Sequence, residues 1–556
     1  MTSPRVLDRL RVKPGWALPI AVFGWAQLVL LGWWAGQWPG LLSADSVRYI
    51  IHVTGGTWTA DHSVLYDSAV LASLNLTGNV ALLTFVQTTV AAACIAYMVV
   101  ALRAVGVPGR WGALAGCLLP LLPSFGAFIS TVWKDVPFAL CEVLITATTL
   151  QLIAHRKAST GYRQVPRRLL VALGLELLGL TLFRNDGFLL VLVIAVVLAL
   201  AWKGLRLVPL GLGAVAILIS FGAQAFVYPA MGVKPANSSL SYGLFDADIA
   251  LAYAQEPDTF TPSDLALLSK VAPLAAWKGA DNCYNSDGLF RSKGFSLVRA
   301  DQYHKQLFAL WWRVLERSPV TVVKGRLCRG SVAWSVMPPP SDKALLGRVV
   351  TRVPSNLYSN SSRQIPADIR QNLATQPLSD KLGRAAHKVR VETGKLRYQW
   401  WMWRGATWCY IAYLVLLVAA LRLRRWDLLT AGVASLANQL TVLAANPAQL
   451  YRYMVGPIFV GFLLLPLLAA AVRRPAVAAG SPAGPGQEPT GLAKDPAAKD
   501  SATQEPTAKD PAAQEPTAKE PAKEPTAQVP EASGATRAVE PDADSTSPVP
   551  PVRSKK

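Results

Sequence analysis

Carboxylate and guanidinium side chains lie in four short polar segments that separate long apolar runs. Those with potential chemistry are Asp45, Asp61 and His62 in the first segment, Lys134 and Asp135 in the second, Arg184, Asn185 and Asp186 in the third, and Tyr451, Arg452 and Tyr453 in the fourth. A carboxylate can accept the proton of an attacking hydroxyl. The planar guanidinium fork binds phosphate oxygens in bidentate fashion. This combination indicates a site for a phosphate-bearing substrate.

The acidic residues also have structural interpretations. Asp45 follows a Pro-Gly turn and could cap a helix that runs along the membrane surface. Asp135 is followed by Pro137 and could cap the next apolar run, with Lys134 reaching to the interface. Asp61-His62 lies in a Gly- and Thr-rich stretch, where a turn is more typical than a metal site. Both kinds of interpretation stay open for Asp45 and Asp135.

Arg184 and Arg452 are harder to explain as surface charges. Arg184 lies in FRNDG, a polar stretch so short that it must lie at the lipid boundary or inside a helix bundle. Arg452 has a similar place before the last apolar run. The alternative interpretation is a pair of salt bridges between helix ends. We predict that both guanidiniums lie on the same side of the membrane as the carboxylates.

The apolar runs predict an all-α polytopic membrane protein. Hydrophobic residues make up 52% of the chain and charged residues 16%, below the roughly 25% of soluble domains. Runs such as 16–34, 80–102 and 454–472 reach the ~20 residues that span ~30 Å of hydrocarbon. We predict about ten transmembrane helices.

The basic residues report topology. The net charge of +21 is dispersed among the segments between apolar runs, which argues against a nucleic-acid partner. Because positive residues mark cytoplasmic segments, Arg5, Arg9, Arg11 and Lys13 place the N-terminus in the cytoplasm, and alternation puts the four polar segments outside. The predicted divisions are a cytoplasmic N-terminus (1–15), transmembrane helices 1–7 with their outer loops (16–228), an extracytoplasmic domain (229–404), transmembrane helices 8–10 (405–474) and a cytoplasmic tail (475–556).

Two of these divisions have further features. The tail consists of near-repeats rich in Pro, Ala, Lys, Glu and Thr, which cannot bury enough apolar surface to fold, so we predict that it is disordered. Cys283 and Cys328 lie in polar stretches of the extracytoplasmic domain and could form a disulfide in an oxidising compartment. The other four cysteines lie in apolar runs.

The polar segments resemble those of the GT-C-fold glycosyltransferases, and above all of less characterised bacterial relatives in which segments similar to DS, WKDxxF and FRNDG recur. The resemblance covers roughly residues 16–472. It implies an enzyme of the bacterial plasma (inner) membrane that moves a sugar from a polyprenyl-phosphate donor to an extracytoplasmic acceptor. Asp45 would be the general base, Asp135 the second-loop carboxylate and Arg452 the basic residue before the last span.

The predicted site combines this resemblance with position in the chain. The catalytic residues are Asp45 and Asp135, and the substrate-binding residues are Lys134, Arg184, Asn185, Tyr451, Arg452 and Tyr453. Many GT-C members have two adjacent acidic residues in the first loop, whereas this chain has Ala44-Asp45-Ser46. A divalent cation is therefore possible but not required, and no other cofactor is expected. Unlike members with a large C-terminal domain, this chain has its outer domain before the last three spans.

Two other functions are compatible with the composition. A polytopic transporter or lipid flippase would have no glycosyl-transfer activity, but such proteins typically show internal repeats and charges at mid-membrane. Here no clear repeat is seen, and the charges gather at one face. A structural envelope protein that binds partners through its tail is the third hypothesis, although it does not explain the four polar loops.

Overall fold

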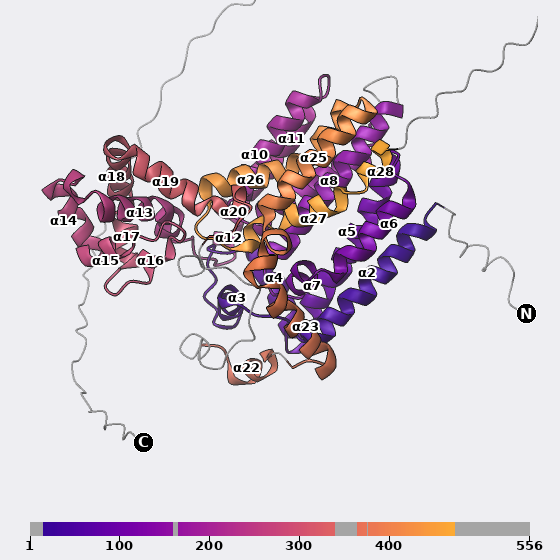
Figure 1. Ribbon diagram of the computed structural model, residues 1–556. Coiled ribbons are helices and arrows are strands. Elements are labelled where there is room, and N and C mark those ends of the chain that lie inside the picture. The colour runs from indigo at the N-terminus through magenta and orange to yellow at the C-terminus, as the bar shows by residue number, and fades with distance from the viewer. Residues whose placement is uncertain (1–14, 159–164, 340–363, 375, 473–556) are drawn as a thin grey trace, which may run out of the picture. The chain divides into compact units, whose positions relative to one another are not determined.

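The computed structural model describes residues 15–158, 165–339, 364–374 and 376–472 (Figure 1). The predicted tail lies outside these residues, and so does the predicted N-terminal segment except for Gly15. Apart from isolated β-bridges, the regular structure of the described residues is helical. The fold class predicted from the sequence, an all-α polytopic membrane protein, is confirmed.

The helices fall into three groups along the chain. The first comprises α2 (Ala17–Gly36), α3 (Ala44–Thr54), α4 (Val64–Thr77), α5 (Ala81–Ala104), α6 (Gly109–Leu118), α7 (Pro123–Ile129), α8 (Asp135–Ala158), α9 (Arg167–Phe183), α10 (Gly187–Ala201), α11 (Leu207–Gly222) and α12 (Tyr228–Ala230). The second comprises α13 (Ser238–Gln255), α14 (Pro262–Val271), α15 (Leu274–Gly279), α16 (Asp287–Phe290), α17 (Leu297–Gln302), α18 (His304–Arg317), α19 (Pro319–Arg329), α20 (Ser331–Trp334), α22 (Ala367–Leu373), α23 (Asp380–Thr393) and α24 (Leu396–Met402). The third comprises α25 (Gly405–Leu423), η5 (Trp426–Gly432), α26 (Val433–Ala445), η6 (Tyr451–Met454), α27 (Val455–Leu464) and α28 (Leu467–Val472).

Seven helical segments of the described chain are long and apolar enough to cross a membrane. An eighth is obtained if the bent pair Gly109–Leu121 and Pro123–Ile129 forms one span. The prediction of about ten exceeds this number because α9 and α10, at the places of the fifth and sixth predicted spans, have only 17 and 15 residues. At 1.5 Å per residue they extend about 26 and about 23 Å, less than the hydrocarbon thickness.

Two apolar cores hold the bundle together. The larger is built from α2, α5, α8, α25 and α27, where Ile95, Val143 and Phe459 are buried. The second lies among α8, α9, α10 and α26. Helix α8 contributes to both cores and packs against α5, α9 and α27. Because α8 begins at Asp135, this packing determines where that carboxylate lies.

The polar segment after α2 folds into α3 and α4, which pack on each other over a separate apolar core. Tyr49 and Ile50 of α3 lie in this core with Tyr66 and Val70 of α4. The opposite face of α3 is polar and carries Asp45, which is only partly buried. Because the apolar face of α3 is packed in this core, Asp45 on the other face stays partly accessible to solvent.

The segment predicted as one extracytoplasmic domain contains two sets of helices. Helices α13–α19 surround their own core, which includes Trp277 and Leu310. Ile365 and Leu373, beside and in α22, instead join the core of α3 and α4, and α23 packs along α2. The placement of this segment outside the membrane, and its boundaries, stay predictions.

The predicted disulfide is present. Cys283 and Cys328 are bonded, with their Cα atoms 5.7 Å apart. Cys94, Cys141 and Cys409 are free and buried in the bundle, as their apolar surroundings in the sequence indicated.

One buried acid of α13 predicts a dependence of stability on pH. Asp246 of α13 is 1% exposed, and neither of its carboxylate oxygens has a hydrogen-bond partner among the described residues. Burial, with a smaller contribution from Asp248, raises the pKa of Asp246 from 3.8 to about 8. The folded chain therefore keeps a proton that the unfolded chain loses near pH 4, so this group reduces stability as the pH rises toward 8.

We expect Asp246→Asn to raise the thermal midpoint at pH 7, by the equivalent of at least about 1 kcal/mol, and to raise it less at pH 5. Asp248→Asn is the matched control in the same helix. Asp248 is ion-paired with Arg326 and Arg329, so its replacement should lower the midpoint. A midpoint of Asp246→Asn that is equal to wild type at both pH values would contradict this account.

Candidate active site

Asp45 lies in the first turn of α3 but does not cap the helix. The cap is Ser43, whose Oγ accepts from the N–H of Ser46 at 3.3 Å, while the N–H of Ser43 donates to Ser46 Oγ at 2.9 Å. Trp133 Nε1 also donates to Ser43 Oγ, at 2.6 Å, and so joins the second loop to the first. The capping interpretation of Asp45 is therefore removed. Its carboxylate is ion-paired with Arg452 instead.

Asp135 is the first residue of α8, and its side chain is only 3% exposed. Its Oδ1 lies 3.4 Å from Nη1 of Arg184, and its Oδ2 lies 3.7 Å from Nη1 of Arg452. Asp135 therefore lies between two guanidiniums that come from different loops. Its role in the structure is to pair with these cations.

Arg452 belongs to the short helix η6 and links the two carboxylates. Its Nη1 donates to Asp45 and faces Asp135. The guanidinium carbon lies 5.2 Å from the ring centre of Trp133 and 5.2 Å from that of Tyr453. These cation–π contacts orient the guanidinium fork.

Arg184 follows α9 and is similarly held by acids and rings. Its Nε and Nη2 donate to Asp186, at 2.9 and 2.7 Å, and its Nη1 donates to Asp135. The guanidinium carbon lies 4.8 Å from the ring centre of Phe138 and 5.1 Å from that of Tyr453. Tyr453 thus contacts both guanidiniums. The site brings Asp45, Asp135, Arg184, Arg452 and Tyr453 together, as predicted by position in the loops.

Two predicted binding residues have structural contacts. Asn185 Nδ2 donates to the carbonyl of Ala60 at 3.1 Å and thereby fastens the third loop to the first. Tyr451 is 5% exposed and lies in the larger bundle core, where its hydroxyl donates to the carbonyl of Ser124 at 3.2 Å. The structure does not support a binding role for Tyr451, because its side chain is buried and its hydroxyl is occupied.

Acidic and basic groups balance in the site. The three acids are Asp45, Asp135 and Asp186, and the three bases are Lys134, Arg184 and Arg452. Burial raises the pKa of Asp45, but the Arg452 guanidinium outweighs this effect and holds the pKa below its usual value. Burial lowers the pKa of Lys134, which is partly offset by Asp135. An entering anion must therefore compete with a carboxylate for a guanidinium.

His62 lies close enough to Asp45 and Lys134 to interact with them electrostatically, although its sequence context favoured a turn over a functional site. Burial, with a further effect of the Lys134 charge, lowers the pKa of His62 to about 3, so the ring is neutral at physiological pH. The ring lies edge-on to Tyr49, with centres 5.0 Å apart. The only signal in the sequence was its proximity to Asp45 along the chain.

Among the residues that the structure describes, no group of three or more His, Cys, Asp or Glu side chains could hold a metal ion. Asp45 and Asp135 are both paired with guanidiniums. The proposed mechanism uses these guanidiniums, and not a divalent cation, as the positive charges of the site.

A family model matches residues 58–481, about three quarters of the chain, and describes a family of unknown function, DUF6020. The chain belongs to this family. The match includes Asp135, Arg184 and Arg452, whereas Asp45 lies outside the matched residues.

None of the curated proteins matches the chain. Among solved structures, ArnT from Cupriavidus metallidurans bound to undecaprenyl phosphate matches with 18% identity and a TM-score of 0.30, over 80% of this chain and 77% of ArnT. A similarity of this size does not assign a function to this chain.

This member of the family also has two acids inside the bundle that the sequence analysis did not identify. Glu142 is fully buried, and its Oε1 accepts from Asn438 Nδ2 at 2.8 Å. Glu176 accepts from the hydroxyl of Thr148 at 2.7 Å. A single Glu within a long apolar run leaves the run intact, so the sequence pattern gave no sign of these contacts. A Cβ at Gly456 would lie 2.4 Å from the Glu142 carboxyl carbon, so any larger residue there would require the Glu142 carboxyl group to move.

Proposed function

We propose that this protein is a membrane glycosyltransferase of the GT-C type that moves a sugar from a polyprenyl-phosphate donor to an acceptor outside the cytoplasm. The observation that carries this proposal is the alternating series Asp45, Arg452, Asp135 and Arg184, whose members come from four separate segments of the chain. This series combines a candidate base with two candidate phosphate-binding groups. The resemblance of the loop segments to GT-C enzymes supports the same assignment.

The guanidiniums would bind the lipid phosphate, which is also the leaving group. Cleavage of the bond between the anomeric carbon and the phosphate oxygen leaves negative charge on the phosphate, and a guanidinium fork stabilises that charge. Arg452 suits this role because two aromatic rings contact its guanidinium and because Asp45 is only partly buried, so this carboxylate partner can be displaced. The Arg184 side chain is less exposed than that of Arg452, and its ion pair with Asp135 holds that carboxylate in place.

Asp45 would act as the general base. It accepts the proton of the acceptor hydroxyl while that oxygen attacks the anomeric carbon, and the lipid phosphate leaves on the opposite side. Without donor, Arg452 neutralises Asp45 and weakens it as a base. A bound phosphate competes for Arg452, which frees the carboxylate and raises its proton affinity when the donor is in place.

A transporter or lipid flippase is the second candidate, because Glu142 and Glu176 lie inside the bundle. Ionisable groups at this depth often mark the paths of ions or substrates. Both acids have a neutral hydrogen-bond partner on a neighbouring helix, however, which also explains them as packing contacts.

One incubation distinguishes the two candidates. Purified protein is mixed with radiolabelled polyprenyl-phosphate sugars and an envelope extract as acceptor. The enzyme releases free lipid phosphate and labels an acceptor, whereas a transporter or scaffold leaves the donor intact. If a panel of hexosyl and pentosyl donors stays intact under conditions that preserve the fold, the proposal is wrong.

We further propose that the site faces outward in the bacterial plasma membrane and that both termini are cytoplasmic, from the distribution of Lys and Arg. Alkaline phosphatase is active only outside the cytoplasm. We expect activity from a fusion near Asn282 and none from a fusion after Arg474. The opposite pattern would reverse the orientation.

A further inference from the structure

The loop that leads to Arg452, residues 446–450, contacts two segments of the preceding helical region. The first of these segments follows Cys283. The N–H and the Oγ of Ser286 both donate to the carbonyl of Pro447, at 2.9 and 3.0 Å. Asn285 forms an isolated antiparallel bridge with Ala448. These contacts hold the first half of the loop.

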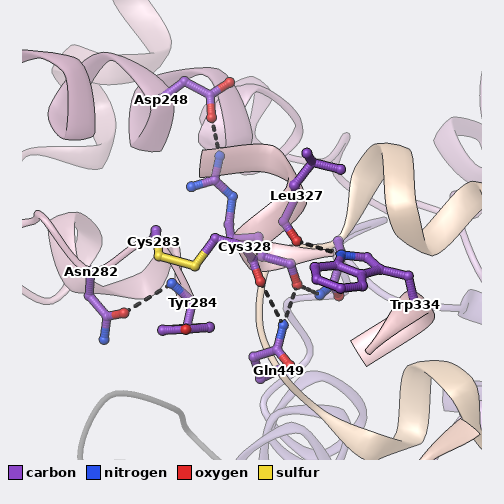
Figure 2. The surroundings of a disulfide bond; sticks show 10 residues. Asp248, Asn282, Cys283, Tyr284, Leu327, Cys328, Trp334 and Gln449 are labelled. Carbon is purple, nitrogen blue, oxygen red and sulfur yellow. Dashed lines mark hydrogen bonds and ion pairs between the residues drawn. A yellow bond between two sulfur atoms is a disulfide. The ribbon is translucent and has the colours of Figure 1, made fainter. Parts of the chain in front are cut away.

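Gln449 holds the second half of the loop to the end of α19. Its Nε2 donates to the carbonyls of Cys328 and Arg329, at 3.1 and 2.6 Å, and its Oε1 accepts from Nη1 of Arg404 at 3.2 Å. Figure 2 shows Gln449 against the backbone at Cys328. The side chain is 2% exposed, and these bonds satisfy both of its polar atoms.

The disulfide joins these two segments, the one after Cys283 and the end of α19, to each other. Cys283 lies beside Asn285 and Ser286, and Cys328 is itself a partner of Gln449 (Figure 2). Arg329, the other partner, is ion-paired through its side chain with Asp248 of α13. The two segments that hold the loop are therefore covalently linked, and one of them is ion-paired with α13.

We propose that the Cys283–Cys328 disulfide and Gln449 form a clamp that positions Arg452 for the lipid phosphate, and that reduction of the disulfide weakens donor binding. Gln449 is a positioning residue, separated from Arg452 only by Leu450 and Tyr451. When the clamp opens, a smaller fraction of molecules holds Arg452 in the binding position, and the apparent affinity falls by that fraction. The effect on the phosphate rests on the proposed function.

The first test follows the loop itself by hydrogen exchange of peptides that cover residues 282–288 and 446–454. The protein is compared in nanodiscs as wild type, as Cys283→Ser with Cys328→Ser, and as wild type treated with a reductant. We expect about tenfold faster exchange in both peptides when the disulfide is absent, and no change in α23. Cys117→Ser, which removes a free thiol elsewhere, should leave both peptides as in wild type. Unchanged exchange in the loop would overturn the clamp.

The second test measures binding of undecaprenyl phosphate to the same samples. We expect the Kd to rise about three- to tenfold without the disulfide and to stay at the wild-type value in Cys117→Ser. Faster exchange with an unchanged Kd would also overturn the proposal, because Arg452 would then not need the clamp. If wild-type protein does not bind the lipid, the proposed function fails, while the exchange data still decide whether the clamp exists.

Gln449→Leu keeps the disulfide and the side-chain volume but removes the hydrogen bonds, so it tests the clamp if the cysteine variants do not fold. We expect faster exchange in residues 446–454 with little change in 282–288, and a raised Kd for undecaprenyl phosphate with near-normal turnover at saturating donor. A merely structural defect would lower the amount of active protein and leave the Kd unchanged, which would reject the positioning role.

Discussion

Replacing Asp45 by asparagine is expected to lower turnover by a factor on the order of 10² or more while the protein stays folded. Asparagine has nearly the same shape, and its Oδ1 can still accept from Arg452, but the amide cannot take a proton at neutral pH. Because Ser43 and not Asp45 caps α3, loss of the charge should not unravel the helix. The measurement is release of lipid phosphate at saturating donor.

The matched control for this variant is Asp61→Asn in the same loop. Asp61 has contacts with Arg48, at 3.7 Å, and with the N–H of Asn237, and has no role in the proposed mechanism. Its variant should keep turnover within about twofold of wild type, as expected for a residue outside the reacting groups. A folded Asp45→Asn protein that turns over at the parental rate would remove Asp45 as the base.

Replacing Arg452 should raise the KM for the donor by about tenfold in the lysine variant and by more in the alanine variant, because lysine supplies a point charge and alanine supplies none. Arg425→Lys is the matched control, since Arg425 forms a comparable pair with Asp427 away from the site, at 2.9 Å. Donor KM values that match wild type in both Arg452 variants would exclude this residue from phosphate binding.

The alanine variant also predicts a shift of the pH profile. Arg452 is the main group that opposes the effect of burial on Asp45, so its loss raises the pKa of Asp45. The base must be deprotonated to act, and kcat/KM reports the free enzyme. The acidic limb of the kcat/KM profile should therefore move to higher pH in Arg452→Ala, relative to wild type. A limb that stays in place would show that Asp45 does not set it.

Much of the fold followed from local patterns along the chain. Each apolar run of suitable length is helical, and the polar contexts of Cys283 and Cys328 separated them correctly from the four cysteines in apolar runs. Two of the predicted spans, α9 and α10, have high hydropathy but are shorter than the segments that meet the length for crossing a membrane. Helix length was predicted less well than helix position, because it depends on where the chain turns.

The pairing within the site could not be read from the sequence. Asp45 and Arg452 are 407 residues apart, and their contact joins α3 to η6 near the other end of the chain. Tyr451 and Tyr453 looked equivalent, yet the turn of η6 directs Tyr451 into the core and Tyr453 toward the guanidiniums. Neighbouring residues of a short helix point in different directions, so only tertiary packing distinguishes them.

The most direct test of the proposed site is to map where the donor headgroup binds. A polyprenyl-phosphate sugar with a photoreactive group next to the phosphate is incubated with the protein in nanodiscs, and the labelled peptides are identified by mass spectrometry. The proposed site predicts labelling of the peptides around Asp45, Asp135 and Tyr453, with strong competition from unlabelled undecaprenyl phosphate. Specific labelling of the bundle interior around Glu142 and Glu176 instead, with none in the loops, would contradict the account and favour a transporter.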